Sequence, residues 1–460
     1  MKNIVNFILV LSMALNLFMP SLSFAAEVKN KSGVDLFALD KTSPEAITIQ
    51  QAVDIALRDN TSVQIAQKNA EIYAQQIRQY TSYVYPQITA SGSYSRALKP
   101  QEVITSMGAF KMNLKNTASG SVEGSLLLWN GGAVSAGIKA AKLLSQSGEL
   151  ELTETRNNIK DLVITLCYGI ILSHALIQVQ QENLDIAKDH LKEINSKYKQ
   201  GLASDLDILN QQVKVSNSEP PLIEAKNGYE LGLLTLRRLL NKDPQEPLSL
   251  TWELKNILSL EIPELEDLYS LAQQNRPELV ISDLQVQMAK EMITIAKADH
   301  YGSIAAFANV SYSGTSDHIV IPVEKNNSSW GSSVGLRISI PLFEGFRVDS
   351  QVKQKELAYE QALLQANDTK RNIRIEVKRC WLNLNEAKQR ILATKDTIAQ
   401  ARKNLDRTNI RYRNGLASRL DLDDSALLLH DAELKYVQAV HDAFTALSNL
   451  NYAVGTEVAK

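Results

Sequence analysis

The sequence lacks a strong net charge of either sign. It has 49 Lys and Arg residues against 51 Asp and Glu residues, which gives a formal net charge of -2 at pH 7. A chain so close to neutral is not expected to bind nucleic acid in general, because such binders present a basic surface.

The residue patterns of common enzyme and metal sites are also missing. The six histidines are scattered, with no His-Glu-x-x-His pattern and no closely spaced cysteine pair. Residues 331–335 match the Gly-x-Ser-x-Gly pattern of serine hydrolases, but they lie inside an alternating strand rather than between a strand and a helix. The sequence therefore predicts no enzyme, no metal site and no cofactor.

Long hydrophobic runs are expected only at the start of the chain. Lys2 precedes an apolar stretch at residues 4–18, and Ser23-Phe24-Ala25 has the small residues of a cleavage site. This pattern predicts a signal peptide at residues 1–25, removed after Ala25, and therefore an exported mature chain. We expect no later stretch to cross a membrane as a helix. Any membrane span would then be a closed β-barrel, the other way to satisfy the backbone in lipid.

The sequence contains an internal repeat. Residues 197–207 read Lys-Tyr-Lys-Gln-Gly-Leu-Ala-Ser-Asp-Leu-Asp, and residues 411–421 read Arg-Tyr-Arg-Asn-Gly-Leu-Ala-Ser-Arg-Leu-Asp. Two such similar segments, so far apart in one chain, indicate that the chain consists of two related halves. We expect a first structural repeat at residues 26–245 and a second at residues 246–460.

Both copies carry apolar residues in alternating steps of four and three. Such a 3.5-residue period predicts a left-handed coiled coil, and the alternative is a long helix in a globular bundle. We expect long helices at residues 132–200 and 345–414, return helices at 202–240 and 416–454, and shorter helical segments at 47–82 and 265–299. The predicted buried positions are Ile159, Val163, Leu166, Ile170, Ser173, Ile177, Gln180, Leu184, Ala187, Leu191, Ile194 and Tyr198 in the first copy, and Ile373, Val377, Cys380, Leu384, Ala387, Ile391, Thr394, Ile398, Ala401, Leu405, Thr408 and Tyr412 in the second.

The two cysteines, Cys167 and Cys380, both fall in predicted helices. In an oxidising compartment a disulfide can form, or each thiol can pack as a small hydrophobe. Packing is favoured, because Leu166 fills in the first copy the helix position that Cys380 occupies in the second.

Between the helices the period changes from helical to two. Apolar residues alternate with small or polar ones near residues 86–129 and 304–341, as in membrane β-strands. Each predicted strand pair encloses a longer loop, at residues 97–116 and 315–329. The alternative is a soluble two-sheet domain. If these strands span a membrane, four of them cannot close a barrel. Several copies of the chain must then contribute strands to one barrel.

The order of these features resembles the TolC-like outer-membrane efflux protein family. The resemblance rests on the signal peptide, the duplicated helix-strand-strand-helix halves, the repeated Tyr-x-x-Gly-Leu-x-Ser-x-Leu-Asp segment and the Ile340-Pro341-Leu342-Phe343-x-Gly345 junction. It implies an α+β membrane protein, in which a homotrimer shares a transmembrane β-barrel continued by an antiparallel α-helical coiled-coil barrel. It also implies a place in the cell outer membrane, with a periplasmic helical domain. The implied partners are outer-membrane lipid, a periplasmic adaptor protein and an inner-membrane transporter of an efflux or type I secretion system.

The resemblance assigns the Gly-Leu-Ala-Ser segments to the tips where the long helices turn back. Glycine tolerates the left-handed conformation that ends a helix, and serine can cap the next helix. We expect these tips to dock the adaptor, the alternative being plain turns. The residues are Gly201, Leu202, Ala203, Ser204, Gly415, Leu416, Ala417 and Ser418.

The resemblance further implies an acidic constriction just beyond the second tip. Asp421 and Asp424 lie one helical turn apart, and three copies would form rings that favour cations. The alternative is an ordinary solvated helix face. Tyr412 and Asp207 match positions that brace neighbouring helices when the family's channels are closed. Ala417 departs from the family's pattern, in which an arginine can occupy this position. Arg419 lies nearby but on a different face of the helix.

The rival hypothesis is a periplasmic coiled-coil adaptor or scaffold without a barrel. Adaptors have one helical hairpin flanked by compact β domains, whereas this sequence predicts two hairpins and short strand pairs. The sequence does not distinguish drugs, metal ions and polypeptides as cargo.

Overall fold

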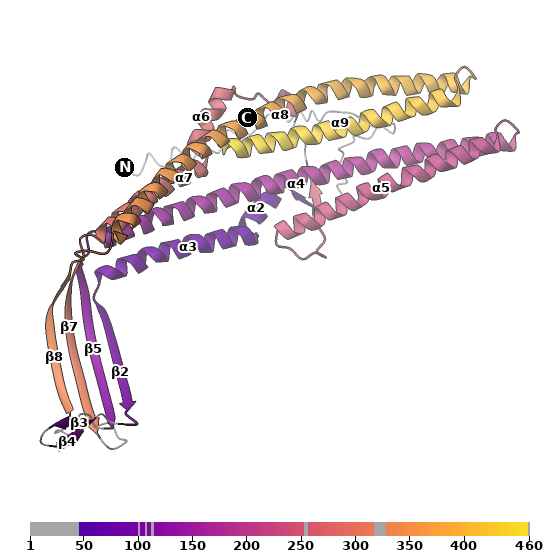
Figure 1. Cartoon of the computed structure of the whole chain (residues 1–460). Helices are drawn as coiled ribbons and strands as arrows, with labels where there is room; N and C mark the ends of the chain where they lie inside the picture. Colours follow the sequence, from indigo (N-terminus) through magenta and orange to yellow (C-terminus); the bar gives the residue numbers. More distant parts are fainter. Residues whose placement is uncertain are drawn as a thin grey trace, which may run out of the picture. The chain divides into compact units, whose positions relative to one another are not determined.

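The computed structural model describes residues 46–99, 102–105, 108–111, 115–252, 256–316 and 328–458 (Figure 1). The predicted signal peptide lies outside these residues. The chain divides into two compact units, each of which combines segments from both predicted repeats. Unit 1 comprises Met1–Asn60, Asn158–Ala272 and Glu376–Lys460, and unit 2 comprises Thr61–Asn157 and Gln273–Ile375.

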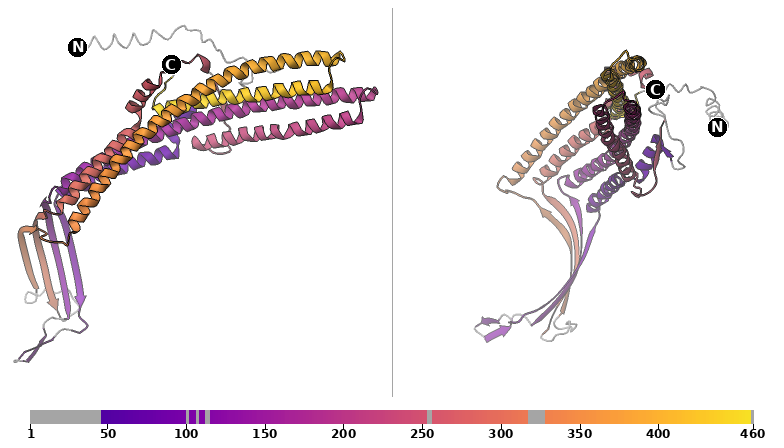
Figure 2. Two further views of the ribbon diagram at one scale, coloured as in Figure 1. Left: turned by 45° about the horizontal axis from the view of Figure 1, so that its top comes forward. Right: turned by 90° about the vertical axis from the view of Figure 1, so that its right-hand side faces the viewer.

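Unit 1 contains the turns and the adjoining parts of two long helical hairpins, and the first part of each long helix belongs to unit 2. The first hairpin pairs α4 (Ala133–Lys199) with α5 (Asp205–Leu239), and the second pairs α8 (Arg347–Arg413) with α9 (Arg419–Val454). The two hairpins lie side by side and turn at the same end (Figure 2). Helices α4 and α8 have 67 residues each, close to the expected bounds.

The predicted periodic positions of α8 are buried or half-buried throughout. Val377, Leu384 and Ile391 have almost no exposed surface. On α4 the pattern drifts, because Cys167 and Ile171 are buried whereas Leu166 and Ser173 are only half-buried. Neither cysteine forms a disulfide and both are buried, in agreement with packing.

The expectation of no further membrane-spanning helix by hydropathy is wrong for α4. By length and composition this helix is apolar enough to cross a membrane. Residues 162–181 contain no Asp, Glu, Lys or Arg. None of residues 163–184 is exposed in unit 1, so helix packing accounts for much of this apolar character.

Each predicted short helical segment is two helices rather than one. Helix α2 (Ile49–Asp59) ends at Asn60, whose side-chain amide donates to the Leu239 carbonyl at 2.9 Å, and α3 (Thr61–Thr81) follows. Helices α6 (Leu265–Asn275) and α7 (Pro277–Ala298) are separated by Arg276, because Pro277 lacks the N–H needed to continue a helix. The parallel pair β1 (Ala46–Thr48) and β6 (Ser249–Thr251) in unit 1 was not predicted.

Unit 2 contains a four-stranded antiparallel sheet with the order β2-β5-β7-β8. The strands are β2 (Gln87–Arg96), β5 (Asn116–Trp129), β7 (Ser303–Ser316) and β8 (Ser328–Ser339), in the regions where the residues alternate. The first loop contains a further hairpin, β3 (Glu102–Thr105) and β4 (Gly108–Lys111), which was not predicted. Strands β2 and β8 have free edges, so the described strands of one chain do not close a barrel.

The register separates the sheet into two chemically different faces. Even-numbered residues pair with even-numbered ones across all four strands, up to a bulge between Leu127 and Trp129. The even face is largely apolar, and Val334 on β8 is 85% exposed. The odd face is rich in hydroxyl groups, which bond across strands, as in Ser91–Ser121 and Ser93–Ser119 at 2.8 Å.

Candidate functional site at the hairpin tips

Each hairpin turns on a glycine in the left-handed conformation. Gly201 has φ +74° and Gly415 has φ +72°. The residue after each glycine donates its backbone N–H over the end of the helix, from Leu202 to the Lys197 carbonyl and from Leu416 to the Arg411 carbonyl, both at 2.8 Å. The preceding helix thus ends in the same way in both hairpins, by a bond that requires the glycine backbone.

The tip residues after each glycine are solvent-facing and alike. Leu202 is 72% exposed and Leu416 is 68% exposed, whereas Ala203 and Ala417 are half-buried. Each tip therefore exposes one large apolar side chain to solvent, and its role in docking an adaptor stays a prediction.

Ser204 and Ser418 begin the return helices with capping boxes. The Ser204 N–H donates to Asp207 Oδ2, and the Ser418 N–H to Asp421 Oδ2, both at 2.8 Å. The backbone N–H of each Asp donates in return to the serine hydroxyl. The hydrogen bonds from the serines lower the pKa of Asp207 and Asp421, so both carboxylates are ionised at neutral pH. These two predicted gate residues therefore also serve as helix caps.

The predicted brace between Tyr412 and Asp207 does not form within one chain. Asp207 is engaged by Ser204, whereas the Tyr412 hydroxyl accepts from Lys197 Nζ at 3.1 Å. Lys197 Nζ also lies 4.5 Å from the centre of the Tyr412 ring and 2.8 Å from Glu193. Tyr412 thus joins α8 to α4, and a Tyr412–Asp207 contact between chains remains a prediction.

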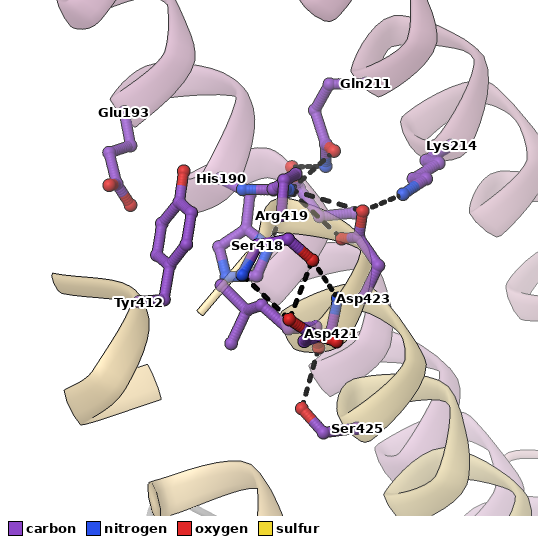
Figure 3. Close-up of polar contacts among 12 residues, drawn as sticks. His190, Glu193, Gln211, Lys214, Tyr412, Ser418, Arg419, Asp421, Asp423 and Ser425 are labelled. Atoms are coloured by element: carbon purple, nitrogen blue, oxygen red, sulfur yellow. Dashed lines mark hydrogen bonds and ion pairs between the residues drawn. The ribbon is translucent and has the colours of Figure 1, made fainter. Parts of the chain in front are cut away.

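A second set of polar contacts links the hairpins just inside the tips (Figure 3). Arg419 Nη2 donates to Gln211 Oε1 at 2.8 Å and to His190 Nδ1 at 3.1 Å. Because a guanidinium can only donate, His190 Nδ1 must be unprotonated here. Arg419 also pairs with Asp423, which Lys214 contacts from α5. We call these five residues, His190, Gln211, Lys214, Arg419 and Asp423, the Arg419 cluster.

The gate role of Asp421 and Asp424 stays a prediction, and the Arg419 cluster was not predicted. Asp424, predicted with Asp421, is exposed on α9. Asp423 lies between them in the sequence, is half-buried and contacts Lys214 of the other hairpin. The i,i+4 spacing of Arg419 and Asp423 was a visible signal, but their partners on α4 and α5 depend on the packing of the hairpins.

A buried carboxyl group lies farther along α9. Glu433 is 4% exposed and accepts from Arg402 Nη2 on α8 at 3.0 Å. Burial and the nearby Glu182 carboxylate on α4 raise the pKa of Glu433 to about 7, although Arg402 opposes them. His430, one turn earlier on α9, has a pKa lowered by burial.

The described residues contain no group of three or more His, Cys, Asp or Glu side chains placed to hold a metal ion. The described cavities near α4 and α8 are shallow and are each lined by one helix. Among the described residues, the polar groups near the tips thus serve mainly as contacts between helices.

Comparison with known proteins gives a consistent assignment. The family model described as "Outer membrane efflux protein" matches residues 52–242 and 268–456. The chain is 22% identical to the outer membrane protein TolC of Escherichia coli over 298 residues, which cover 64% of this chain and 60% of TolC. The match thus spans less than two thirds of that relative. This chain is also 19% identical to the cobalt-zinc-cadmium resistance protein CzcC of Cupriavidus metallidurans, over 97% of this chain and 98% of CzcC.

The fold is that of solved outer-membrane channels. The CmeC outer membrane channel of Campylobacter jejuni aligns with a TM-score of 0.77 and 16% identity, over 96% of this chain and 94% of that one. At this identity the likeness establishes the fold alone.

Proposed function

The chain belongs to the outer membrane efflux protein family, and from this premise we propose that it is the exit duct of a tripartite efflux or type I secretion system. It is a protein of the cell outer membrane with a periplasmic helical domain, and its family consists of channels rather than enzymes. The duct would carry cargo outward from a periplasmic adaptor and an inner-membrane transporter.

The observation that carries the proposal is the open four-stranded sheet with one apolar and one hydroxyl-rich face. Lipid can accept the even face but not the free edges of β2 and β8. Three chains would join edge to edge into a twelve-stranded barrel, with the odd face around an aqueous pore. The two structural repeats, residues 26–245 and 246–460, would each contribute one strand pair and one hairpin.

Aromatic residues at the two ends of the strands support this placement. Tyr312 and Trp330 contact each other near the loop end, with ring centres 5.1 Å apart. Trp129 and Tyr301 lie near the helix end, with ring centres 6.4 Å apart. Membrane barrels carry such aromatic residues at both interfaces, where the rings meet the lipid headgroups.

The hairpin tips would dock the adaptor through Leu202, Leu416 and their neighbours. Asp421 and Asp424 would form acidic rings in the trimer, which favour cations and narrow the periplasmic entrance. Tyr412 would contact Asp207 of a neighbouring chain in the closed state. The Arg419 cluster would hold the two hairpins of one chain together beside these rings.

We propose export as the function but assign no specific cargo. The printed name of CzcC concerns resistance to cobalt, zinc and cadmium, but a likeness of 19% does not transfer that cargo. The adaptor hypothesis receives no support, because the family model describes an outer membrane efflux protein.

The test is the conductance of the purified protein in a planar bilayer, compared with Asp421→Asn/Asp424→Asn. Asparagine keeps a cap acceptor beside Ser418 but removes the charge. We expect a small, cation-selective conductance in the wild type, and a larger or less selective one in the variant.

A matched control is Glu264→Gln/Asp267→Asn, which neutralises two exposed carboxylates at the same spacing on and just before α6. An equal change in both variants would discard the gate but keep the duct. A folded wild type without any conductance would discard the duct.

A further inference from the structure

The hydroxyl-rich face of the sheet carries very few charges. Among the odd-numbered residues of the four described strands, the charged side chains are Glu123 on β5 and Arg337 on β8. Most of the others are Ser, Thr, Ala or Gly. A lone charge on a wall of hydroxyl groups dominates the local electrostatic potential, because nothing nearby neutralises it.

Arg337 is held over an aromatic ring, and it forms no ion pair with a carboxylate among the residues that the structure describes. Its guanidinium carbon lies 5.1 Å from the centre of the Phe307 ring on β7. A cation–π contact orients the guanidinium but leaves its N–H donors free for a ligand in the plane of the group. Arg337 is exposed, so a ligand in the solvent beside the sheet can reach these donors.

The ring has its place because the residue opposite is glycine. Phe307 pairs directly with Gly335. A Cβ at Gly335 would lie 3.1 Å from the Phe307 ring atoms Cε1 and Cζ, closer than ordinary contact. Gly335, Phe307 and Arg337 therefore form one structural unit on the odd face, with glycine making room for the ring and the ring supporting the cation.

Glu123 does not neutralise this unit. Glu123 pairs with Asn309, which pairs with Ser333, four residues from Arg337 along β8. At about 3.3 Å per residue the two charges lie at levels about 13 Å apart along the strands. The face thus has an acidic level and a separate basic level, the basic one nearer the helices.

We propose that Arg337 is a selectivity-determining position of the duct that contacts anionic groups of the cargo, such as carboxylates or phosphates. The inference rests on the proposed function, in which the odd face lines a shared pore. Three copies would place three guanidinium groups around one level of the pore. A guanidinium binds carboxylate and phosphate in bidentate fashion, which suits transient recognition of a passing anion. The positive charge at this level is opposite in sign to that of the acidic rings proposed at the tips.

The experiment is the reversal potential of single channels in a potassium chloride gradient, with Arg337→Gln, Arg337→Lys and Glu123→Gln. We expect Arg337→Gln to raise the potassium-to-chloride permeability ratio about threefold, and Arg337→Lys to stay near the wild type. Glu123→Gln should shift the ratio in the opposite direction. Phe307→Leu, which removes the support but no charge, should give a smaller shift in the same direction as Arg337→Gln.

The matched control is Arg96→Gln, the same change on the even face of the same sheet. Its ratio should equal that of the wild type. A wild-type ratio in Arg337→Gln and Phe307→Leu channels would overturn the inference while leaving the duct intact. A folded wild type that forms no channel would overturn the proposed function, and this inference with it.

Discussion

The two helical hairpins share their turns and their lengths, yet they differ in which helix is enclosed. In the first hairpin the long helix α4 has no exposed residue from 163 to 184, whereas the return helix α5 is mostly exposed. In the second hairpin the reverse holds, because α9 has many more buried residues than α5 and α8 is exposed on most of its surface.

The contacts between the hairpins explain this inversion. Helix α4 packs against α9, where Tyr168 and Phe444 have ring centres 5.1 Å apart and Ser448 donates to Asp161 at 2.7 Å. The enclosed helices α4 and α9 thus lie between α5 and α8, as Figure 2 shows. A repeated sequence therefore does not give a repeated environment, because each copy is the neighbour of the other.

Glu433 gives the sharpest test of this comparison. Its pKa of about 7 lies above the ordinary value of 4.5, so the folded chain binds the proton more tightly than the unfolded chain. This carboxyl therefore favours folding most below pH 4.5, and the advantage is lost as pH rises through about 7. We expect the free energy of unfolding to fall by up to about 3 kcal/mol across this window, and Glu433→Gln to remove that loss.

The corresponding residue of the first hairpin, Glu219 on α5, is exposed. Glu219→Gln makes the same change on an exposed helix face and is the matched control. Denaturant unfolding at several pH values, followed by circular dichroism in detergent micelles, measures both variants. An equal response would mean that the two return helices are equally enclosed.

Adding a charge to the flank of α4 and removing one from the flank of α8 tests the same inversion. Leu176 on α4 corresponds to Arg390 on α8, and Leu176 is half-buried. We expect Leu176→Lys to lower the free energy of unfolding by about 2 kcal/mol, because a charge at this half-buried position loses part of its hydration.

Arg390→Leu, the reverse change, should cost less than about 1 kcal/mol. Arg390 is partly exposed and makes ion pairs with Glu386 and Asp442, which contribute little in solvent. The same denaturant titration compares the two variants. Equal losses would contradict the assignment of α4 as the enclosed helix and α8 as the exposed one.

The smallest effect is expected where the hairpins are alike. Ser204→Ala and Ser418→Ala should each cost about 1 kcal/mol, because each removes the hydroxyl of a capping box. Amide hydrogen exchange should quicken in the first turn of α5 or α9 only. A difference of more than about 1 kcal/mol between the two variants would show that the tips are not equivalent.

The sequence predicted the long helices and their turns well, because their signals are local. The Gly and Ser of each tip act within five residues, and the apolar spacing of α8 fits its buried stripe. The division of the shorter helical segments was missed, since Asn60 is held by Leu239, a distant residue. Among the site residues, the gate role of Asp421 and Asp424 came from the family resemblance and stays a prediction, whereas the partners of Arg419 were not predicted.

The sequence by itself determined the period of each segment, the positions of the turns and the alternation of the strands. These depend on side chains within one or two turns of each other, where spacing fixes which face a residue shares. The tertiary structure alone decided that α4 and α9 are the enclosed helices, that Glu433 lies beside Arg402 and that Arg337 lies over Phe307. Those outcomes depend on which helix or strand becomes the neighbour of another, and local spacing does not contain that information.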